Sequence, residues 1–358
     1  MAQYLCKVKI NSHKCVSLRA NNRELILLNR IKSLSTKTLY IINLCRLNAV
    51  VNLFRAPKKH LQTTLNISLY SLFTFFSCQL SAEKLTIIYP EVNAPYDVIF
   101  NQIKSGITSE FNGEIVEIKL PAKFNNDEVI KSITTDKVIA LGKRGWLIAK
   151  QIYKTKPVVV GALPIKPNGI SGVSLMASPQ VLFHTLKELA PKVKTITVLY
   201  SKNSSWLIDK AKLEAQNQGF KLQPIAVNNI KEAVQKYDEL FADNKLEDQA
   251  IWLPLDPVTA DDKVIVPVIL EKAWENKMVV FSSKPTHAKR GALFSAVPDN
   301  KLLGHQLAKM VHRISEKKQS MVTPMDDIKL AVNLRTAAHL GFAYNASTRS
   351  TFALTFPN

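Results

Sequence analysis

The chain has 358 residues, 46% of them hydrophobic, which is enough for two domains with sizeable cores. Its formal net charge is +20, but residues 1–82 carry more than half of this excess, with 12 Lys/Arg against the single acid Glu24. No run of Lys or Arg in the remainder is longer than two, so the charge does not predict nucleic-acid binding. All four cysteines lie within the first 78 residues, which excludes a disulfide framework, a thiolate metal site and a cysteine nucleophile from the rest of the chain.

A segment near residue 60 has the order of features of a secretory signal peptide. The cationic stretch Lys58-Lys59-His60 precedes a mostly apolar run over residues 61–76, and the small residue Ala82 follows shortly after. The run is too short and too polar for a stable membrane span, although an uncleaved N-terminal anchor shares the pattern. We therefore predict a signal peptide over residues 58–82 and a periplasmic or extracellular mature protein. Simple cleavage after Ala82 is favoured over lipoprotein anchoring at Cys78, because the residue three positions before that cysteine is aromatic.

Residues 1–57 precede this signal peptide, although signal peptides begin at the N-terminus. The segment is basic, lacks glycine and has irregular apolar patches. Two interpretations stay open. The segment is a non-native or disordered extension, with translation starting near residues 50–60, or it is an organellar transit peptide, a class that is also poor in acidic residues.

From Lys84 onward, strand and helix patterns alternate. Ile99, Ile103 and Ile107 recur at helical spacing after Pro95 and predict a helix that ends near residue 112. The further expected helices cover residues 127–133 and 146–152, and the expected strands cover residues 85–89, 114–118, 137–141 and 157–160. This alternation is typical of βαβ units, which build a parallel sheet with helices on both faces.

The stretch over residues 169–205 ends this series and opens a second one. Ser178-Pro179 predicts a helix start with the serine hydroxyl as N-cap, and Pro191 ends that helix. The later expected strands cover residues 195–200, 220–227, 250–253, 278–281 and 293–297, and the later helices cover residues 206–217, 230–241, 264–274 and 303–314. No low-complexity linker separates the two series. We therefore expect an α/β protein whose two lobes are joined by several crossing strands.

Five ordered segments carry a resemblance to a known family. They are Ile170–Val173 (ISGV), Leu186–Val193 (LKELAPKV), Gly291–Leu293 (GAL), Leu303–Gln306 (LGHQ) and Val332–Ala337 (VNLRTA). Over residues 84–343 the chain resembles the ABC-transporter substrate-binding family that includes tryptophan- and tyrosine-binding proteins. The resemblance implies a type I periplasmic-binding-protein fold, in which two Rossmann-like lobes on a multi-strand hinge close on a ligand like a Venus flytrap.

The resemblance also implies a division into lobes and a function. The first lobe would comprise residues 83–190 plus 286–317, and the second would comprise residues 191–285 plus 318–358. A small polar ligand, an amino acid or a related compound, would bind in the cleft and be delivered to an ABC permease in the membrane. Family resemblance implies no catalytic centre, and we expect no cofactor, no metal, no nucleic-acid partner and a monomeric chain.

Candidate ligand residues in the second lobe follow predicted strands, because ligands of open parallel sheets bind beyond the carboxyl ends of strands. Ser201, Asn203 and Ser204 follow the strand over residues 195–200 and could donate hydrogen bonds to a ligand carboxylate at a helix N-terminus. Asp256 could pair with a ligand ammonium, and Ser283 follows the last strand of the lobe. The same residues are also typical of helix caps and turns. We expect these loops to carry little core, so that replacing Asp256 would leave the unliganded protein as stable as before.

Candidates in the first lobe also follow strands. Asn93 and Tyr96 follow the strand over residues 85–89, and Tyr96 either stacks on a ligand or packs in the lobe. Gly142 and Lys143 follow the third strand. Here the chain departs from the family, whose members tend to carry small, uncharged residues at this loop. A cation pair formed by Lys143 and Arg144 would suit a more anionic ligand, or would simply be solvated.

Enzyme motifs are missing from the sequence. There is no Gly-x-Gly-x-x-Gly after a strand, no phosphate-binding Gly-x-x-x-x-Gly-Lys-Ser/Thr and no Gly-x-Ser-x-Gly elbow, and the seven histidines do not have metal-ligand spacing. A solute-binding protein for transport is therefore the leading hypothesis. The alternatives are a sensing protein that presents its ligand state to a membrane receptor and, less favoured, an α/β enzyme acting on a small anion.

Overall fold

The computed structural model describes residues 5–9, 15–19, 83–242, 248–317 and 320–357. The chain divides into two compact units, Met1–Leu80 and Ser81–Asn358, and each is described by itself. In the first unit, strands β1 (Leu5–Lys9) and β2 (Cys15–Arg19) pair antiparallel, within the segment for which a non-native or disordered extension is one interpretation. The predicted signal peptide over residues 58–82 lies outside the described residues.

The second unit contains a six-stranded sheet in which every pair of neighbours is parallel. Its order is β13-β7-β6-β5-β3-β4, with the strands β3 (Glu83–Pro90), β4 (Gly113–Leu120), β5 (Lys137–Leu141), β6 (Val158–Leu163), β7 (Ser171–Ala177) and β13 (Val322–Met325). All five residues of β5 are buried, as expected for a central parallel strand covered on both faces.

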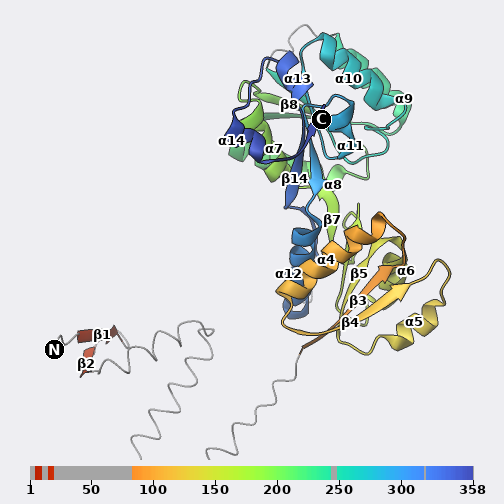
Figure 1. Cartoon of the computed structure of the whole chain (residues 1–358), viewed down its shortest axis with the longest axis vertical. Coiled ribbons are helices and arrows are strands. Elements are labelled where there is room, and N and C mark those ends of the chain that lie inside the picture. The colour runs from red at the N-terminus through yellow and green to blue at the C-terminus, as the bar shows by residue number, and fades with distance from the viewer. Residues whose placement is uncertain (1–4, 10–14, 20–82, 243–247, 318–319, 358) are drawn as a thin grey trace, which may run out of the picture. The chain divides into compact units, whose positions relative to one another are not determined.

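A seven-stranded sheet forms the core of the other lobe. Its order is β15-β14-β12-β11-β10-β8-β9, with the strands β8 (Thr195–Tyr200), β9 (Lys221–Ala226), β10 (Gln249–Leu253), β11 (Val279–Ser282), β12 (Phe294–Pro298), β14 (Ile328–Asn333) and β15 (Phe352–Phe356). Only β12 and β14 pair antiparallel. The predicted α/β class with two lobes is confirmed, and Figure 1 shows β7, β14 and α12 at the junction of the lobes.

Helices cover both sheets. They are α4 (Tyr96–Glu110), α5 (Asn126–Ser132), α6 (Gly142–Ile152), α7 (Pro179–Leu189), α8 (Ser205–Gln218), α9 (Ile230–Phe241), α10 (Ile265–Glu275), α11 (Thr286–Arg290), α12 (Asn300–Lys317), α13 (Leu334–His339) and α14 (Ala346–Ser350). None of the helices in the described part of the chain is long and apolar enough to cross a membrane.

The chain crosses between the two sheets at three places. The crossings lie between β7 and α7, between β12 and α12, and between β13 and β14. Neighbouring crossings are bonded to each other, because the Ser178 amide donates to the Met325 carbonyl at 2.8 Å and the Ser178 hydroxyl bonds the Asp326 carboxyl. The hydroxyl predicted to cap α7 therefore joins two crossings, although the helix does begin at Pro179 as expected.

Sheet membership places three segments differently from the expected lobe boundaries. Helix α7 packs against α8, and its buried Leu182 and Leu186 belong to the core of the seven-stranded sheet. Residues 286–298 also belong to that lobe through α11 and β12, whereas β13 joins the six-stranded sheet. We call the lobe with the six-stranded sheet, α4, α5, α6 and α12 the first lobe, and the lobe with the seven-stranded sheet and the remaining helices the second lobe.

Helices α4 and α12 make a very close contact in the first lobe. A Cβ placed on Gly106 would lie 1.9 Å from the Lys301 carbonyl oxygen, and a Cβ on Gly304 would lie 2.1 Å from the Ile103 carbonyl oxygen. Both glycines are therefore required by the approach of the two helix backbones. Since α12 follows the second crossing, this contact fastens a late segment of the chain to an early one.

Candidate ligand-binding site

The candidate residues of the second lobe lie at the carboxyl ends of adjacent strands. In the sheet, β10 lies between β8 and β11, and all three are parallel. The loops that follow them, which contain Ser201, Asp256 and Ser283, therefore leave the sheet at one edge. The sequence placed these residues at strand ends, and the sheet order brings them together.

Asp256 is buried at this edge, with only 3% of its surface exposed. Its Oδ2 atom accepts hydrogen bonds from the Ser201 amide at 3.0 Å, the Ser201 hydroxyl at 2.8 Å and the Ser204 hydroxyl at 2.5 Å. Its Oδ1 atom accepts one from the Val258 amide at 2.9 Å. Burial by itself would raise the pKa of the Asp256 carboxyl, but the hydrogen bonds from Ser204, Val258 and Ser201 outweigh it and lower the pKa. The carboxylate is thus held ionised by donors from its own lobe.

These bonds make Asp256 the link between the loop after β8 and the loop after β10. Ser204 precedes α8 but makes no side-chain cap to that helix, because its hydroxyl points to the carboxylate instead. The expectation that Asp256 carries little stability is therefore not supported by its contacts. Its removal would leave four donors in the second lobe without their acceptor.

Asn203 connects this edge to the first lobe. Its Oδ1 atom accepts a hydrogen bond from Lys166 Nζ at 3.0 Å, and both side chains are exposed. Lys166 lies in the loop that leaves the carboxyl end of β6. The loop after β6 in the six-stranded sheet therefore contacts the loop after β8 in the seven-stranded sheet.

Ser283 is buried and serves the interior of the second lobe. Its hydroxyl accepts a hydrogen bond from the Trp252 indole nitrogen at 3.0 Å, and its amide donates to the Leu253 carbonyl at 2.9 Å. The indole ring itself lies in the core. As a result the Ser283 side chain ties β10 to the segment after β11.

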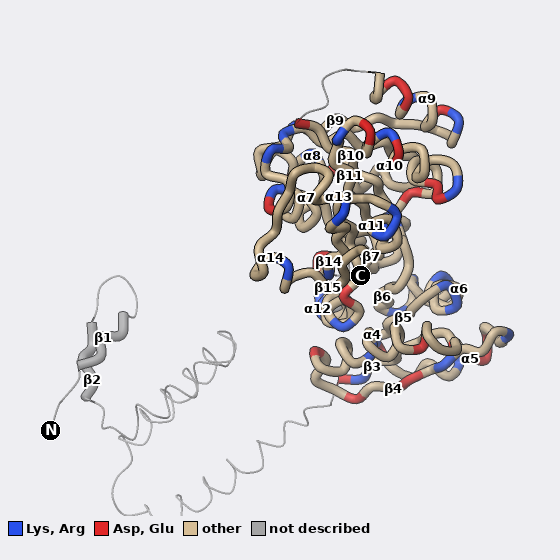
Figure 2. Tube along the Cα trace, turned by 45° about the horizontal axis from the view of Figure 1, so that its top comes forward, with Lys and Arg blue, Asp and Glu red and all other residues tan. Residues whose placement is uncertain are grey.

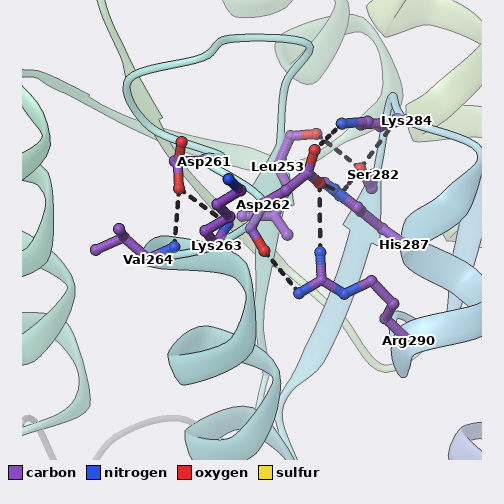
Figure 3. A network of polar contacts seen from close by, with 9 residues as sticks. All are labelled: Leu253, Asp261, Asp262, Lys263, Val264, Ser282, Lys284, His287 and Arg290. Atoms are coloured by element: carbon purple, nitrogen blue, oxygen red, sulfur yellow. Dashed lines mark hydrogen bonds and ion pairs between the residues drawn. The ribbon is translucent and has the colours of Figure 1, made fainter.

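A second polar network, which the sequence did not predict, includes Ser282 and Lys284, the two neighbours of Ser283 in the chain (Figure 3). Asp262 accepts from Lys284 Nζ, from His287 Nε2 at 2.9 Å and from Arg290 Nη1 at 3.3 Å. His287 is fully buried, and its Nδ1 atom lies 2.8 Å from the Ser282 hydroxyl. The ion pair with Lys284 is the main cause that lowers the pKa of Asp262, and burial lowers the pKa of His287. The neutral imidazole then donates a hydrogen bond from Nε2 to Asp262, and its Nδ1 atom accepts a hydrogen bond from the Ser282 hydroxyl.

The strand-end residues of the first lobe are more exposed. The Asn93 carbonyl accepts the Tyr96 amide at 3.1 Å, and the Tyr96 side chain is 64% exposed. Asp97, in the first turn of α4, was not predicted, yet its Oδ1 atom is buried and has no hydrogen-bond partner among the described residues. A carboxylate directly after a strand-end loop is the signal that could have identified it.

Gly142 begins α6 directly after β5, with no intervening loop. Its φ of +68° is a left-handed conformation that favours glycine. Lys143 is exposed, whereas Arg144 Nη1 donates to the carbonyls of Glu91 at 2.7 Å and Leu120 at 2.8 Å. Arg144 therefore connects two strand-end loops, whereas Lys143 makes no such hydrogen bond to any residue that the structure describes.

The comparisons with known proteins agree with this fold. The family model described as "ABC transporter substrate binding protein" matches residues 126–351, well over half of the chain. The chain belongs to this family, whose members are binding proteins rather than enzymes.

Similar individual proteins are known from several bacteria. A tyrosine-binding protein of Clostridioides difficile (strain R20291) is 25% identical over 188 residues, which are 50% of this chain and 52% of that protein. The chain thus spans about half the length of this curated relative. The ligand-free, open structure of a substrate-binding protein with adhesive properties from Clostridium difficile is 22% identical, with a TM-score of 0.52, and covers 76% of this chain and 99% of that one. An ABC domain in complex with L-Trp from Streptococcus pneumoniae is 21% identical, with a TM-score of 0.45, and covers 76% and 100%. The fold is that of type I periplasmic binding proteins.

Proposed function

We propose that this protein is an extracytoplasmic solute-binding protein that holds an amino acid between its two lobes and delivers it to an ABC permease. The observation that carries the proposal is the hydrogen bond between Lys166 and Asn203, which brings together strand-end loops of both sheets. Family membership supports delivery to a permease. The tyrosine-binding relative supports an aromatic amino acid as the ligand.

The ligand carboxylate needs hydrogen-bond donors and positive potential. Helix α6 starts at the strand end with the buried Gly142, and the exposed Lys143 adds a cation there. The free N–H groups and partial positive charge of a helix N-terminus favour an anion at this position. The N-terminus of α8, beside the exposed Asn203, offers the same features from the second lobe. We assign the carboxylate to these groups.

The ligand ammonium needs a carboxylate oxygen with spare capacity to accept hydrogen bonds. Asp97 Oδ1 has such capacity, since none of the described residues donates to it. Three of the four bonds to Asp256 converge on Oδ2, so we assign Asp256 chiefly to holding Ser201 and Ser204 in place for the ligand. Tyr96, which is largely exposed beside Asn93, would then cover an aromatic ligand side chain.

Closure of the lobes would accompany binding. Three chain crossings join the lobes, and bending there would move one strand-end edge against the other. A ligand favours the closed form only through contacts that it makes better in that form. Contacts from the start of α6 in one lobe and from the start of α8 in the other would meet this requirement.

Titration calorimetry of the full chain with the twenty amino acids and with small dicarboxylates tests the proposal. We expect the tightest binding for tyrosine or tryptophan, and about tenfold weaker binding for the Lys143→Ala variant, the loss of roughly 1.4 kcal/mol. Lys150→Ala is the matched control, because Lys150 is an exposed cation near the other end of the same helix. No binding of any amino acid would overturn the proposal.

A further inference from the structure

A cavity of about 540 Å³ lies on the second lobe, and none of the strand-end site residues lines it. One wall is α10, which contributes Pro267, Leu270 and Trp274. The opposite wall is formed by the end of α11 and the start of α13, with Lys289, Arg290 and Arg335. A volume of this size is in the usual range for small-molecule sites. We call this cavity the α10–α11 groove.

Positive charge dominates the α10–α11 groove. Figure 2 shows cationic positions at α11 and α13, where the three cations of the groove lie. The acid among the lining residues is Glu271. In the described part of the chain, Lys289 and Arg335 make no ion pair, whereas Arg290 is shared with Asp262. The two unpaired cations thus have no internal counter-ion.

Arg335 is supported by an aromatic stack. Its guanidinium carbon lies 5.4 Å from the centre of the Trp274 ring, within the range of a cation–π contact. The indole in turn stacks on His339, with ring centres 3.7 Å apart, and His339 Nε2 donates to the Trp274 carbonyl at 2.8 Å. A smaller hollow of about 360 Å³, lined by Lys289, Arg335 and Phe356 among others, adjoins these cations. The ring contact thus holds Arg335 in place, and none of its five N–H donors bonds to another residue in the described part of the chain.

We propose that the α10–α11 groove is a second binding site, which takes a small multivalent anion bearing phosphate or several carboxylates. The planar guanidinium of Arg335 matches either group through two parallel hydrogen bonds, and Lys289 supplies a second charge. The groove carries three cations against one acid, so a multivalent anion is favoured over a monovalent one. This site is independent of the amino-acid site between the lobes.

The test is titration calorimetry of the full chain at low ionic strength with inorganic phosphate, pyrophosphate and citrate. We expect pyrophosphate or citrate to bind more tightly than phosphate, and the double variant Lys289→Ala/Arg335→Ala to bind at least tenfold more weakly. The control is Lys192→Ala/Lys221→Ala, which removes two exposed cations of the same lobe that line neither hollow. Control affinity should equal that of the unaltered chain.

The outcomes distinguish a specific anion-binding site from non-specific attraction of anions to a positively charged surface. Pyrophosphate binding without citrate binding would identify phosphate chemistry, and the reverse would identify carboxylate chemistry; both support the site. Absence of binding at millimolar anion would overturn it, as would equal weakening in the control variant. Should the double variant fail to fold, the conservative Arg335→Lys variant replaces it, with several-fold weaker binding expected because the bidentate fork is lost.

Discussion

The two lobes differ at the edge of the sheet where the carboxyl ends of the parallel strands lie. In the second lobe, Asp256 is buried and accepts four hydrogen bonds from its own lobe, and Asp262 pairs with Lys284. In the first lobe, Tyr96 and Lys143 are exposed, and Asp97 Oδ1 has no partner among the described residues. One half of the proposed site is thus preorganised, while the other half keeps its groups available.

This difference indicates that the second lobe's groups mainly stabilise the fold, whereas the first lobe's groups mainly contact the ligand. Buried groups that satisfy one another fix the shape of the second lobe but have little capacity left for a ligand. Exposed groups contribute little to stability and can supply contacts to a ligand. The first lobe is instead stabilised by the close contact between α4 and α12 at Gly106 and Gly304. Substitutions of the polar groups at the second lobe's edge should therefore change the stability of the protein, and those at the first lobe's edge should change its affinity for the ligand.

The largest expected effect comes from breaking the support of the first lobe. In Gly304→Ala the new Cβ would overlap the Ile103 carbonyl oxygen, so the helices must move apart. We expect a loss of about 3 kcal/mol in the free energy of unfolding, at the upper end for overpacking, measured by urea denaturation. Ser105→Ala, on an exposed position of α4, is the control and should be nearly neutral. Equal stability of Gly304→Ala and the unaltered chain would disprove the close contact.

Asp256→Ala should have the next largest effect, on the second lobe. It leaves the Ser201 and Ser204 hydroxyls and two backbone amides without their acceptor, at a cost of about 2–3 kcal/mol in unfolding free energy. Asp209→Ala, which removes only an exposed ion pair to Lys212, should stay within about 0.5 kcal/mol. A change no larger than that of the control would mean that the Asp256 network does not stabilise the lobe.

Asp97→Asn should show the reverse pattern. The change keeps the shape of the side chain but removes the charge that we assign to the ligand ammonium. We expect about tenfold weaker amino-acid binding by calorimetry, roughly 1.4 kcal/mol, with an unchanged melting temperature of the unliganded chain. Unchanged affinity would remove Asp97 from the site, while a lowered melting temperature would show that it is structural.

The smallest effect concerns pH. Burial lowers the pKa of His287 below its ordinary value of 6.5, so between the folded and unfolded pKa values the unfolded chain binds more protons. Stability should therefore fall as the pH decreases below 6.5, by at most about 1.4 kcal/mol per pH unit for this one group. His287→Asn should lose this part of the pH dependence when urea denaturation is compared at pH 7.5 and pH 5.5. An identical pH dependence in both proteins would contradict the assignment.

Local patterns in the sequence were enough to predict many elements. Runs such as Val158-Val159-Val160 predicted buried strands, and the spacing of Ile99, Ile103 and Ile107 predicted α4. The last two of these isoleucines are buried in α4. Patterns of this kind work because burial of one face imposes a period on neighbouring residues. The α/β class and the positions of Ser201 and Asp256 after strands followed from them.

Contacts between distant residues could not be predicted in this way. Two partners of Asp256, Ser204 and Ser201, lie 52 and 55 residues away, and Asp262 meets His287 across 25 residues. Such pairs depend on which strands are neighbours in the sheet, and periodicity carries no information about neighbours. The sequence by itself determined many of the strands and helices and the polar loops that follow them. Only the tertiary structure decided that α7 belongs to the second lobe and that β13 joins the first, because sheet order and chain crossings set which groups meet. For the same reason it alone decided that Asp256 has its hydrogen-bond donors, while Asp97 Oδ1 has no partner among the described residues.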